Sequence, residues 1–238
     1  MASFFKTQTD EEIDASVRSL ILAADAEGLE AQLKKVRAPL TGGPPTALNM
    51  HTQFTEKMPL LFLSVMHDNA NATRLLLAAK APINTVDGSG ATACFLAARN
   101  DAASCLEVLI GAGANVDLAR HSGASPLYVA TQNDSRRCLR LLIDGGADVN
   151  APKEGGFTPL AIGTLRNRKE CVEMLVQAGA DVNRAYTVAD RFTPLMLSAH
   201  CNHIEARTRH PRTWHRRRLR LLLLIGLLHQ PAHLLLLH

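Results

Sequence analysis

Apolar side chains recur at helical spacing in short blocks along the chain. In one block, Leu139, Leu142 and Ile143 follow steps of three and one, which place them on one face of a helix. The same arrangement returns at two other places, in Leu106-Leu109-Ile110 and Val172-Leu175-Val176. Polar turn residues separate these blocks from other short apolar blocks. The pattern predicts a chain of short helices rather than a sheet.

The blocks repeat with a period of 33 residues. The positions that carry this period are Gly90, Gly123 and Gly156, then Ala81, Ala114, Ala147 and Ala180, then Asp68, Asp101, Asp134 and Asn167. A fixed period of this size is typical of stacked supersecondary units. Because a single unit cannot cover its own apolar face, the units must stack to form a core.

Each unit has its own start and stop signals. Pro126 and Pro159 stand where a first helix begins, and Thr158 precedes its proline, where a hydroxyl can cap free amides. The Asp and Asn of the period tolerate the left-handed backbone that ends a first helix. Three glycines end the second helices as left-handed terminal residues do, at Gly113, Gly146 and Gly179.

The unit resembles the ankyrin repeat. The segments that carry the resemblance are Phe157-Thr158-Pro159-Leu160, Cys171 to Val176, and Ala178-Gly179-Ala180-Asp181-Val182-Asn183. The frame also fits around Pro126 and Thr92, more loosely at Met58-Pro59-Leu60, and at Phe192-Thr193-Pro194-Leu195. The resemblance implies an all-α fold, an ankyrin-type helical solenoid of stacked helix-turn-helix repeats with hairpin-like turns.

Three parts of the chain are expected. Residues 1–56 are interpreted as N-terminal capping helices, from about Asp10 to Asp25 and from about Leu29 to Val36, followed by a long loop. Residues 57–206 hold about four full repeats and one partial repeat. Residues 207–238 form a basic and then Leu-rich tail, with seven Arg and no acid. Without the tail, 19 basic side chains face 22 acidic ones, so the repeats are mildly acidic.

The tail has three interpretations, which the sequence leaves open. The segment Leu221–Leu228 can complete the fifth repeat as a displaced helix, or the tail can anchor the chain to a membrane, or it has no evolved role. A spanning helix needs about 20 apolar residues, and the run Leu221–Leu228 is much shorter.

Cysteine and histidine do not form a site with regular spacing. Cys105, Cys138 and Cys171 share one repeat position, and we interpret them as buried reduced thiols. The cluster His200, Cys201, His203, His210 and His215 lacks the ligand pattern of a zinc site. We therefore expect no metal, no cofactor and no catalytic residues, and we do not expect the protein to be an enzyme.

One departure from the ankyrin pattern concerns the His that usually follows Pro-Leu. By the fitted frame its positions here are Leu61, Phe95, Tyr128, Ala161 and Met196. We expect apolar contacts to replace the hydrogen bonds that this His would make.

The resemblance implies a protein-protein interaction module, an adaptor or scaffold in the cytoplasm. It implies binding of an unidentified protein ligand through turn tips and the concave groove, with no small-molecule substrate. Neither nucleic acid nor a membrane is expected as a partner. The alternative is a membrane-tethered adaptor, or the regulatory fragment of a larger enzyme. The residues predicted to bind protein are Arg99, Arg120, His121, Gln132, Lys153, Glu154, Arg184 and Tyr186.

Overall fold

The computed structural model describes residues 10–37, 58–184 and 193, and this part of the chain is all-helical. Its only extended pairing is an isolated antiparallel bridge between Val86 and Thr92. Its helices are α1 (Asp10–Leu22), α2 (Ala26–Arg37), α3 (Leu60–Met66), α4 (Ala70–Ala78), α5 (Ala93–Asn100), α6 (Ala103–Gly111), α7 (Pro126–Asn133), α8 (Arg136–Asp144), α9 (Pro159–Leu165) and α10 (Lys169–Gln177).

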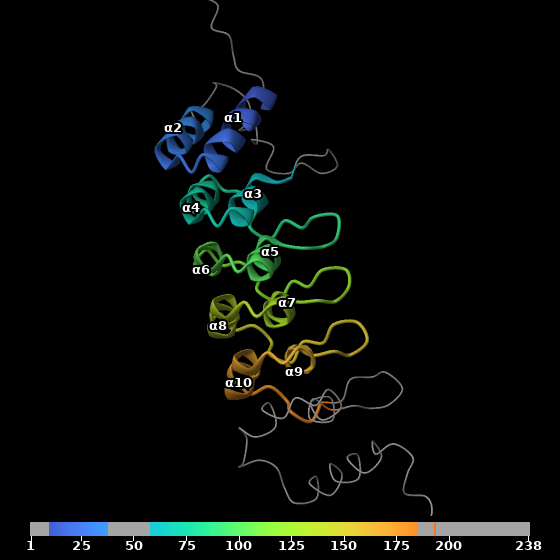
Figure 1. Ribbon diagram of the computed structural model, residues 1–238. Coiled ribbons are helices and arrows are strands. Elements are labelled where there is room, and N and C mark those ends of the chain that lie inside the picture. The colour runs from blue at the N-terminus through green and yellow to red at the C-terminus, as the bar shows by residue number, and fades with distance from the viewer. Residues whose placement is uncertain (1–9, 38–57, 185–192, 194–238) are drawn as a thin grey trace, which may run out of the picture. The chain divides into compact units, whose positions relative to one another are not determined.

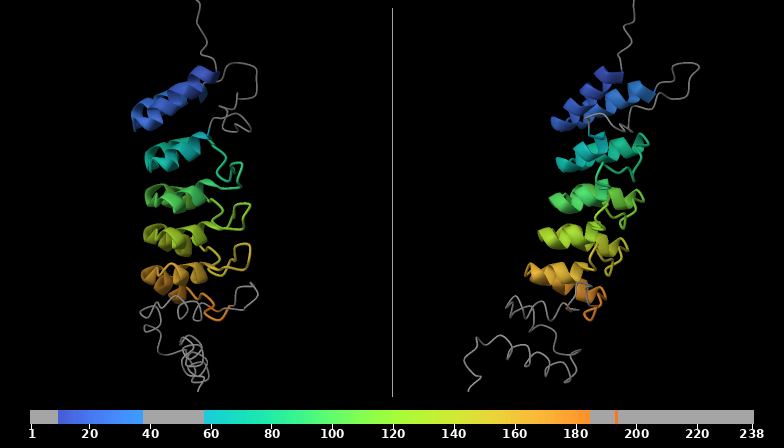
Figure 2. Two further views of the ribbon diagram at one scale, coloured as in Figure 1. Left: turned by 45° about the vertical axis from the view of Figure 1, so that its right-hand side comes forward. Right: turned by 90° about the vertical axis from the view of Figure 1, so that its right-hand side faces the viewer.

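The chain divides into two compact units, one up to Asp148 and one from Val149. In the first unit the helices pack in sequential pairs, and each pair packs on the next: α1, α3, α5 and α7 form one row, and α2, α4, α6 and α8 form the other (Figures 1 and 2). In the second unit α9 packs on α10. Stacked helix pairs are the arrangement that the 33-residue period predicted.

The first helices begin with hydroxyl caps. At Thr92, Ser125 and Thr158 the side-chain oxygen accepts the backbone N–H of the third residue onward, at 3.2 Å in each case. Pro126 and Pro159 follow the cap as the first helical residue, where a missing N–H costs nothing. The predicted role of Thr158 and of both prolines is confirmed.

The helices end where left-handed residues were predicted. Four side-chain-bearing residues close the first helices with positive φ angles, 46° at Asp68, 57° at Asp101, 65° at Asp134 and 55° at Asn167. The second helices run into glycines with φ of 83° at Gly113, 83° at Gly146 and 88° at Gly179. Both sets reverse the chain at a fixed point, so every described repeat keeps the same geometry.

The register around Pro59 differs from the expectation. Pro59 occupies the N-cap of α3, which is the position of Thr92 and Ser125 and not that of Pro126. The aligned residue after the helix start is therefore Phe62, and the assignment of Leu61 to the usual His position is wrong. Pro59 misled the alignment because proline is acceptable both at a cap and at the first helical residue.

The two N-terminal helices also have different bounds from those expected. The first ends at Leu22 because Ala24 takes a left-handed backbone, with φ of 56°. The second begins earlier, at Ala26, because Asp25 Oδ1 accepts the N–H of Gly28 at 2.9 Å and so caps the new helix. These two helices pack on each other, and they pack on α3 and α4 as one further layer.

The core lies between the layers and is built of small and aliphatic side chains. Cys105, Leu106 and Leu109 of α6 have no exposed surface, and Ala93 to Ala98 of α5 are all buried. Phe62 and Phe95 are among the largest fully covered side chains. Within the described ranges no helix is long and apolar enough to span a membrane. The tail from 207 to 238 and the fifth repeat beyond Thr193 lie outside those ranges.

Removal of a cap should destabilise the first unit measurably. We expect Ser125→Ala to lower the free energy of unfolding by about 1 kcal/mol, because the Tyr128 N–H loses its acceptor at a buried site. Urea denaturation followed by circular dichroism measures this change. Ser104→Ala, an exposed serine of α6, is the matched control and should change stability by less than about 0.5 kcal/mol. Equal effects of the two substitutions would contradict the capping role.

Candidate functional site

The loops that precede the first helices share one backbone frame. In each, the N–H of the first turn residue donates to a carbonyl four residues on, and the N–H three residues on donates back to its carbonyl. The first distances are 2.9 Å at Asp87, 3.1 Å at Arg120 and 2.8 Å at Lys153, and the return bonds are 2.8–2.9 Å. The frame is constant although an acid, an arginine and a lysine occupy the same position.

Asp87 uses its carboxylate to hold its own loop. Its Oδ1 accepts the N–H of Ser89 at 2.8 Å, the Ser89 hydroxyl at 2.6 Å and the N–H of Ala91 at 2.9 Å. Partial burial favours a higher pKa for Asp87. The hydrogen bonds from Ser89 and Ala91 and the charge of Arg120 outweigh it, so the pKa lies below its usual value. Asp87 was not among the predicted site residues, although it shares the position of Arg120.

Arg120 lies against the first helix of the layer before it. Its guanidinium carbon lies 5.5 Å from the centre of the Phe95 ring, within the range of a cation–π contact. Its Nε is buried and has no hydrogen-bond partner among the described residues. Phe95 stands where ankyrin repeats usually carry His, and this contact agrees with the expectation of a substitute for the missing hydrogen bonds.

His121 joins two neighbouring loops. Its backbone N–H donates to the carbonyl of Ser89 at 2.9 Å. Its ring lies over Gly90, where an added Cβ would come within 2.6 Å of the His121 Cδ2. Gly90 has a φ of 79°, so both the backbone and the close ring require glycine there. His121 itself remains exposed, so it presents its ring from a fixed base.

A second set of bonds ties each loop base to the next repeat. Asn84 Oδ1 accepts the N–H of Asn115 at 3.0 Å, and Asp117 Oδ1 accepts the N–H of Asp148 at 2.9 Å. In the second unit Asn150 Oδ1 accepts the N–H of Asp181 at 2.8 Å. The loops are thus anchored at their bases, and the tips are free to differ in side chain.

The predicted residues Arg99 and Gln132 lie at the other end of the first helices. They occupy the same repeat position, two residues before the left-handed residue, on α5 and α7, which pack together. Arg99 is exposed and Gln132 is half-buried. The Asn133 amide donates from Nδ2 to the carbonyl of Arg99 at 2.9 Å, so these helix ends lie side by side.

The structure therefore separates the predicted residues into groups. In the first unit Arg120 and His121 lie on one loop, and Arg99 and Gln132 lie at the opposite ends of the first helices. Lys153, Glu154 and Arg184 belong to the second unit. There Lys153 takes the turn position of Arg120, and Glu154 and Arg184 are exposed. Tyr186 lies outside the described residues, as does the His200–His215 cluster.

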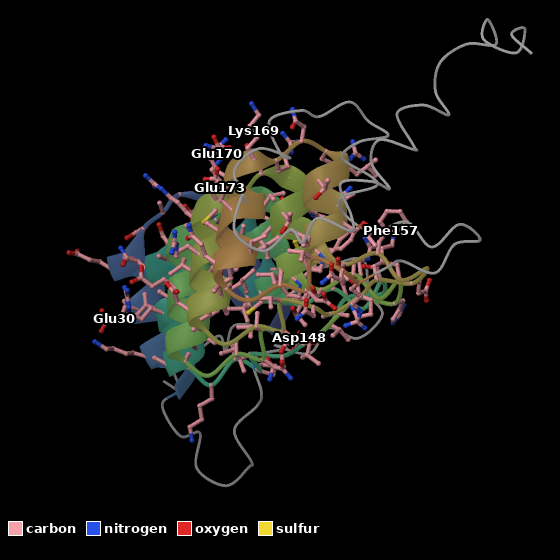
Figure 3. The ribbon with its side chains drawn as sticks, turned by 90° about the horizontal axis from the view of Figure 1, so that it is seen from below. Glu30, Asp148, Phe157, Lys169, Glu170 and Glu173 are labelled. Carbon is pink, nitrogen blue, oxygen red and sulfur yellow. The ribbon has the colours of Figure 1, made fainter. Side chains whose placement is uncertain are left out.

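The second helices carry a different, mixed-charge surface. Arg74, Glu107 and Arg140 recur at one repeat position and alternate in sign, and all three are exposed. In the second unit Figure 3 shows Glu170 and Glu173 of α10 well away from Phe157, which precedes the cap of α9. An open groove of about 650 Å³ between α4 and α6 has Arg74 and Glu107 on its walls, and no predicted site residue lines it.

The cysteines of the described residues are free and buried, at Cys94, Cys105, Cys138 and Cys171. Burial raises the pKa of Cys94 to about 12 and is the first cause of the same rise at Cys105. At Cys138 burial, and then the charge of Asp101, raise the pKa to about 12. The interpretation as packed thiols is confirmed. In the part of the chain that the structure covers, no three His, Cys, Asp or Glu residues gather as metal ligands.

Comparison with known families matches residues 104–186 to ankyrin repeats, in a model of three copies. A comparison with curated proteins found no match. The matched residues run from α6 to just beyond α10, and they include the caps at Ser125 and Thr158 and the loop positions Arg120 and Lys153.

The contact between Arg120 and Phe95 should contribute to stability. In a double-mutant cycle of Arg120→Met and Phe95→Leu, we expect a coupling free energy of about 0.5–1 kcal/mol, because only the intact pair has a cation over a ring. Urea unfolding of the four proteins measures it. Arg140→Met replaces Arg120→Met in the control cycle and should give no coupling with Phe95→Leu.

The buried thiols should make the protein less stable above pH 9. Below that pH a thiol is protonated in both states. Between about 9 and 12 only the unfolded chain releases the proton, so the free energy of unfolding falls with pH by about 1.4 kcal/mol per unit per thiol. Urea denaturation at pH 8 to 10.5 measures the slope. Cys138→Ala should make the slope shallower, and an unchanged slope would show that Cys138 ionises freely when folded.

Proposed function

Because residues 104–186 are ankyrin repeats, we propose that this protein is a non-catalytic module that binds a protein partner through its loop tips and the ends of its first helices. Ankyrin repeats are generally protein–protein interaction modules. The proposal takes the adaptor or scaffold role as the function, and no second function has an observation in its favour.

The constant frame with changing side chains is the observation that carries the proposal. The same turn, closed by the same two backbone bonds, presents a carboxylate at Asp87, a guanidinium at Arg120 and an ammonium at Lys153. A scaffold that holds its backbone fixed loses little conformational entropy on binding, which favours affinity. Side chains that differ at one repeated position supply selectivity without a change of fold.

The contribution of each loop residue to binding follows from its contacts. His121 is exposed on a base that its own backbone bond to Ser89 fixes, so it is suited to direct contact with a partner. Arg120 is half-buried against Phe95, so its replacement changes the loop as well as the surface. Arg99, Glu154 and Arg184 are exposed, and their replacement tests contact alone.

Two steps test the proposal. Proximity labelling with the full chain identifies candidate partners, and binding of each purified candidate is then measured. We expect the combined change Arg99→Glu, His121→Glu and Arg184→Glu to weaken a true partner by at least about tenfold, because hot spots concentrate binding energy in a few side chains. Circular dichroism should not change, since these three side chains are exposed.

The matched control reverses a charge on the second helices. Arg140→Glu alters one exposed arginine of α8, which lies outside the proposed surface, and it should leave affinity within about twofold. If Arg140→Glu weakened binding and the combined variant did not, the partner would bind to the second helices and the proposal would be wrong.

A further inference from the structure

Two exposed apolar side chains occupy the repeat position that Arg99 and Gln132 also occupy. Four large apolar side chains of the described residues are exposed, Leu22 at 57%, Met58 at 39%, Met66 at 43% and Val86 at 51%. Leu22 and Met66 each stand two residues before a left-handed residue, Ala24 and Asp68. This is the position of Arg99 before Asp101 and of Gln132 before Asp134. We call Leu22, Met66, Arg99 and Gln132 the helix-end column.

Packing places the members of this column on neighbouring layers. α1 packs on α3, α3 on α5 and α5 on α7, so their ends follow one another along the first unit (Figure 1). At one end of the column, Asn69 donates from Nδ2 to the carbonyl of Ile21 at 3.2 Å, which holds the end of α1 beside the turn after α3. At the other end, Asn133 holds the carbonyl of Arg99. The column is therefore apolar over its first two layers and polar over its last two.

The cation of the column has no partner of its own. Arg99 forms no ion pair within the described ranges, although acidic residues lie nearby in the sequence. Asp68 is turned toward the second helices, because its Oδ1 accepts the N–H of Cys105 on α6 at 3.3 Å. Asp101 lies close to Cys138 of α8 in the same way. Asp134 pairs with Arg136 at 2.8 Å. The acids therefore leave the guanidinium of Arg99 available to a ligand.

We propose that the helix-end column binds one amphipathic peptide segment of a protein partner, which places apolar side chains on Leu22 and Met66 and a carboxylate on Arg99. The inference rests on the proposed function and names the chemistry of its partner. Burial of the exposed apolar surface favours apolar partner side chains, since a polar group there would lose water without gaining a bond. The free arginine fork matches a carboxylate, and Gln132 supplies a further donor and acceptor beside it.

Selection from a random peptide library displayed on phage tests this proposal with the full chain as bait. The probes are the enriched peptides themselves, synthesised with a fluorescent label and titrated by anisotropy. We expect the enriched peptides to combine at least two large apolar residues with an acidic residue. A Glu→Lys change in such a peptide should weaken its binding to the chain by about tenfold or more.

Matched variants locate the binding site. Met66→Gln and Arg99→Glu should each weaken the peptide by about tenfold, whereas Met174→Gln on α10 and Arg140→Glu on α8 should leave it within about twofold. The charge swap is the sharpest comparison, since Arg99→Glu should restore binding of the peptide that carries Lys. Met66 and Arg99 are exposed, so both variants should fold, and circular dichroism checks that they do.

Several results would overturn the inference. Enriched peptides without acids, or binding that Met66→Gln and Arg99→Glu leave unchanged, would exclude the helix-end column. If His121→Glu abolished such binding, the proposed function would stand and only this inference would fail. If no variant of the loop tips or helix ends changed the binding, both would fail. Dimerisation of the chain that Met66→Gln prevents would show that a second copy occupies the column, and the inference would be wrong.

Discussion

The structure depends on burial of the helix faces between successive layers. A helix pair of this size cannot cover its own apolar side, and α5 shows the consequence, since Ala93 to Ala98 are all buried between α3 and α7. Aromatics make up only 4% of the chain, so this burial relies on close approach of small and aliphatic side chains. Hydroxyl caps and left-handed residues then set where each helix starts and stops. They keep every layer the same length, which lets one layer fit the next.

The same constraint determines which residues can serve function. Side chains of the first helices are covered along most of their length, so the chain can vary only at the loop tips and at the helix ends. The loops are tied by backbone bonds within each turn and by Asn84 and Asp117 between turns. Binding at these places therefore needs little rearrangement. The thiols at the centre of the layers do not contribute to this surface, because burial keeps them protonated.

Features that recur every 33 residues could be predicted from the sequence, and features that depend on contacts between layers could not. The left-handed Asp101, the glycine ends, the Thr158 cap and the buried cysteines all follow from one repeated frame. The register of α3 did not, because the long segment before Met58 breaks the period and Pro59 suits two positions. The stacking of Arg120 on Phe95 joins residues of two repeats. Leu22 and Met66 escaped notice because the step between their layers is longer than 33 residues, so subtraction does not align them.

Hydrogen–deuterium exchange of the chain with and without a bound partner tests the central claim most directly. The claim is that binding involves the loop tips and first-helix ends and not the second helices. It predicts slower exchange on binding at amides around His121, Arg99 and Gln132, with little change in the exposed turns of α4, α6 and α8. Protection confined to α4, α6 and α8, with the loops and first-helix ends unaffected, would contradict the account.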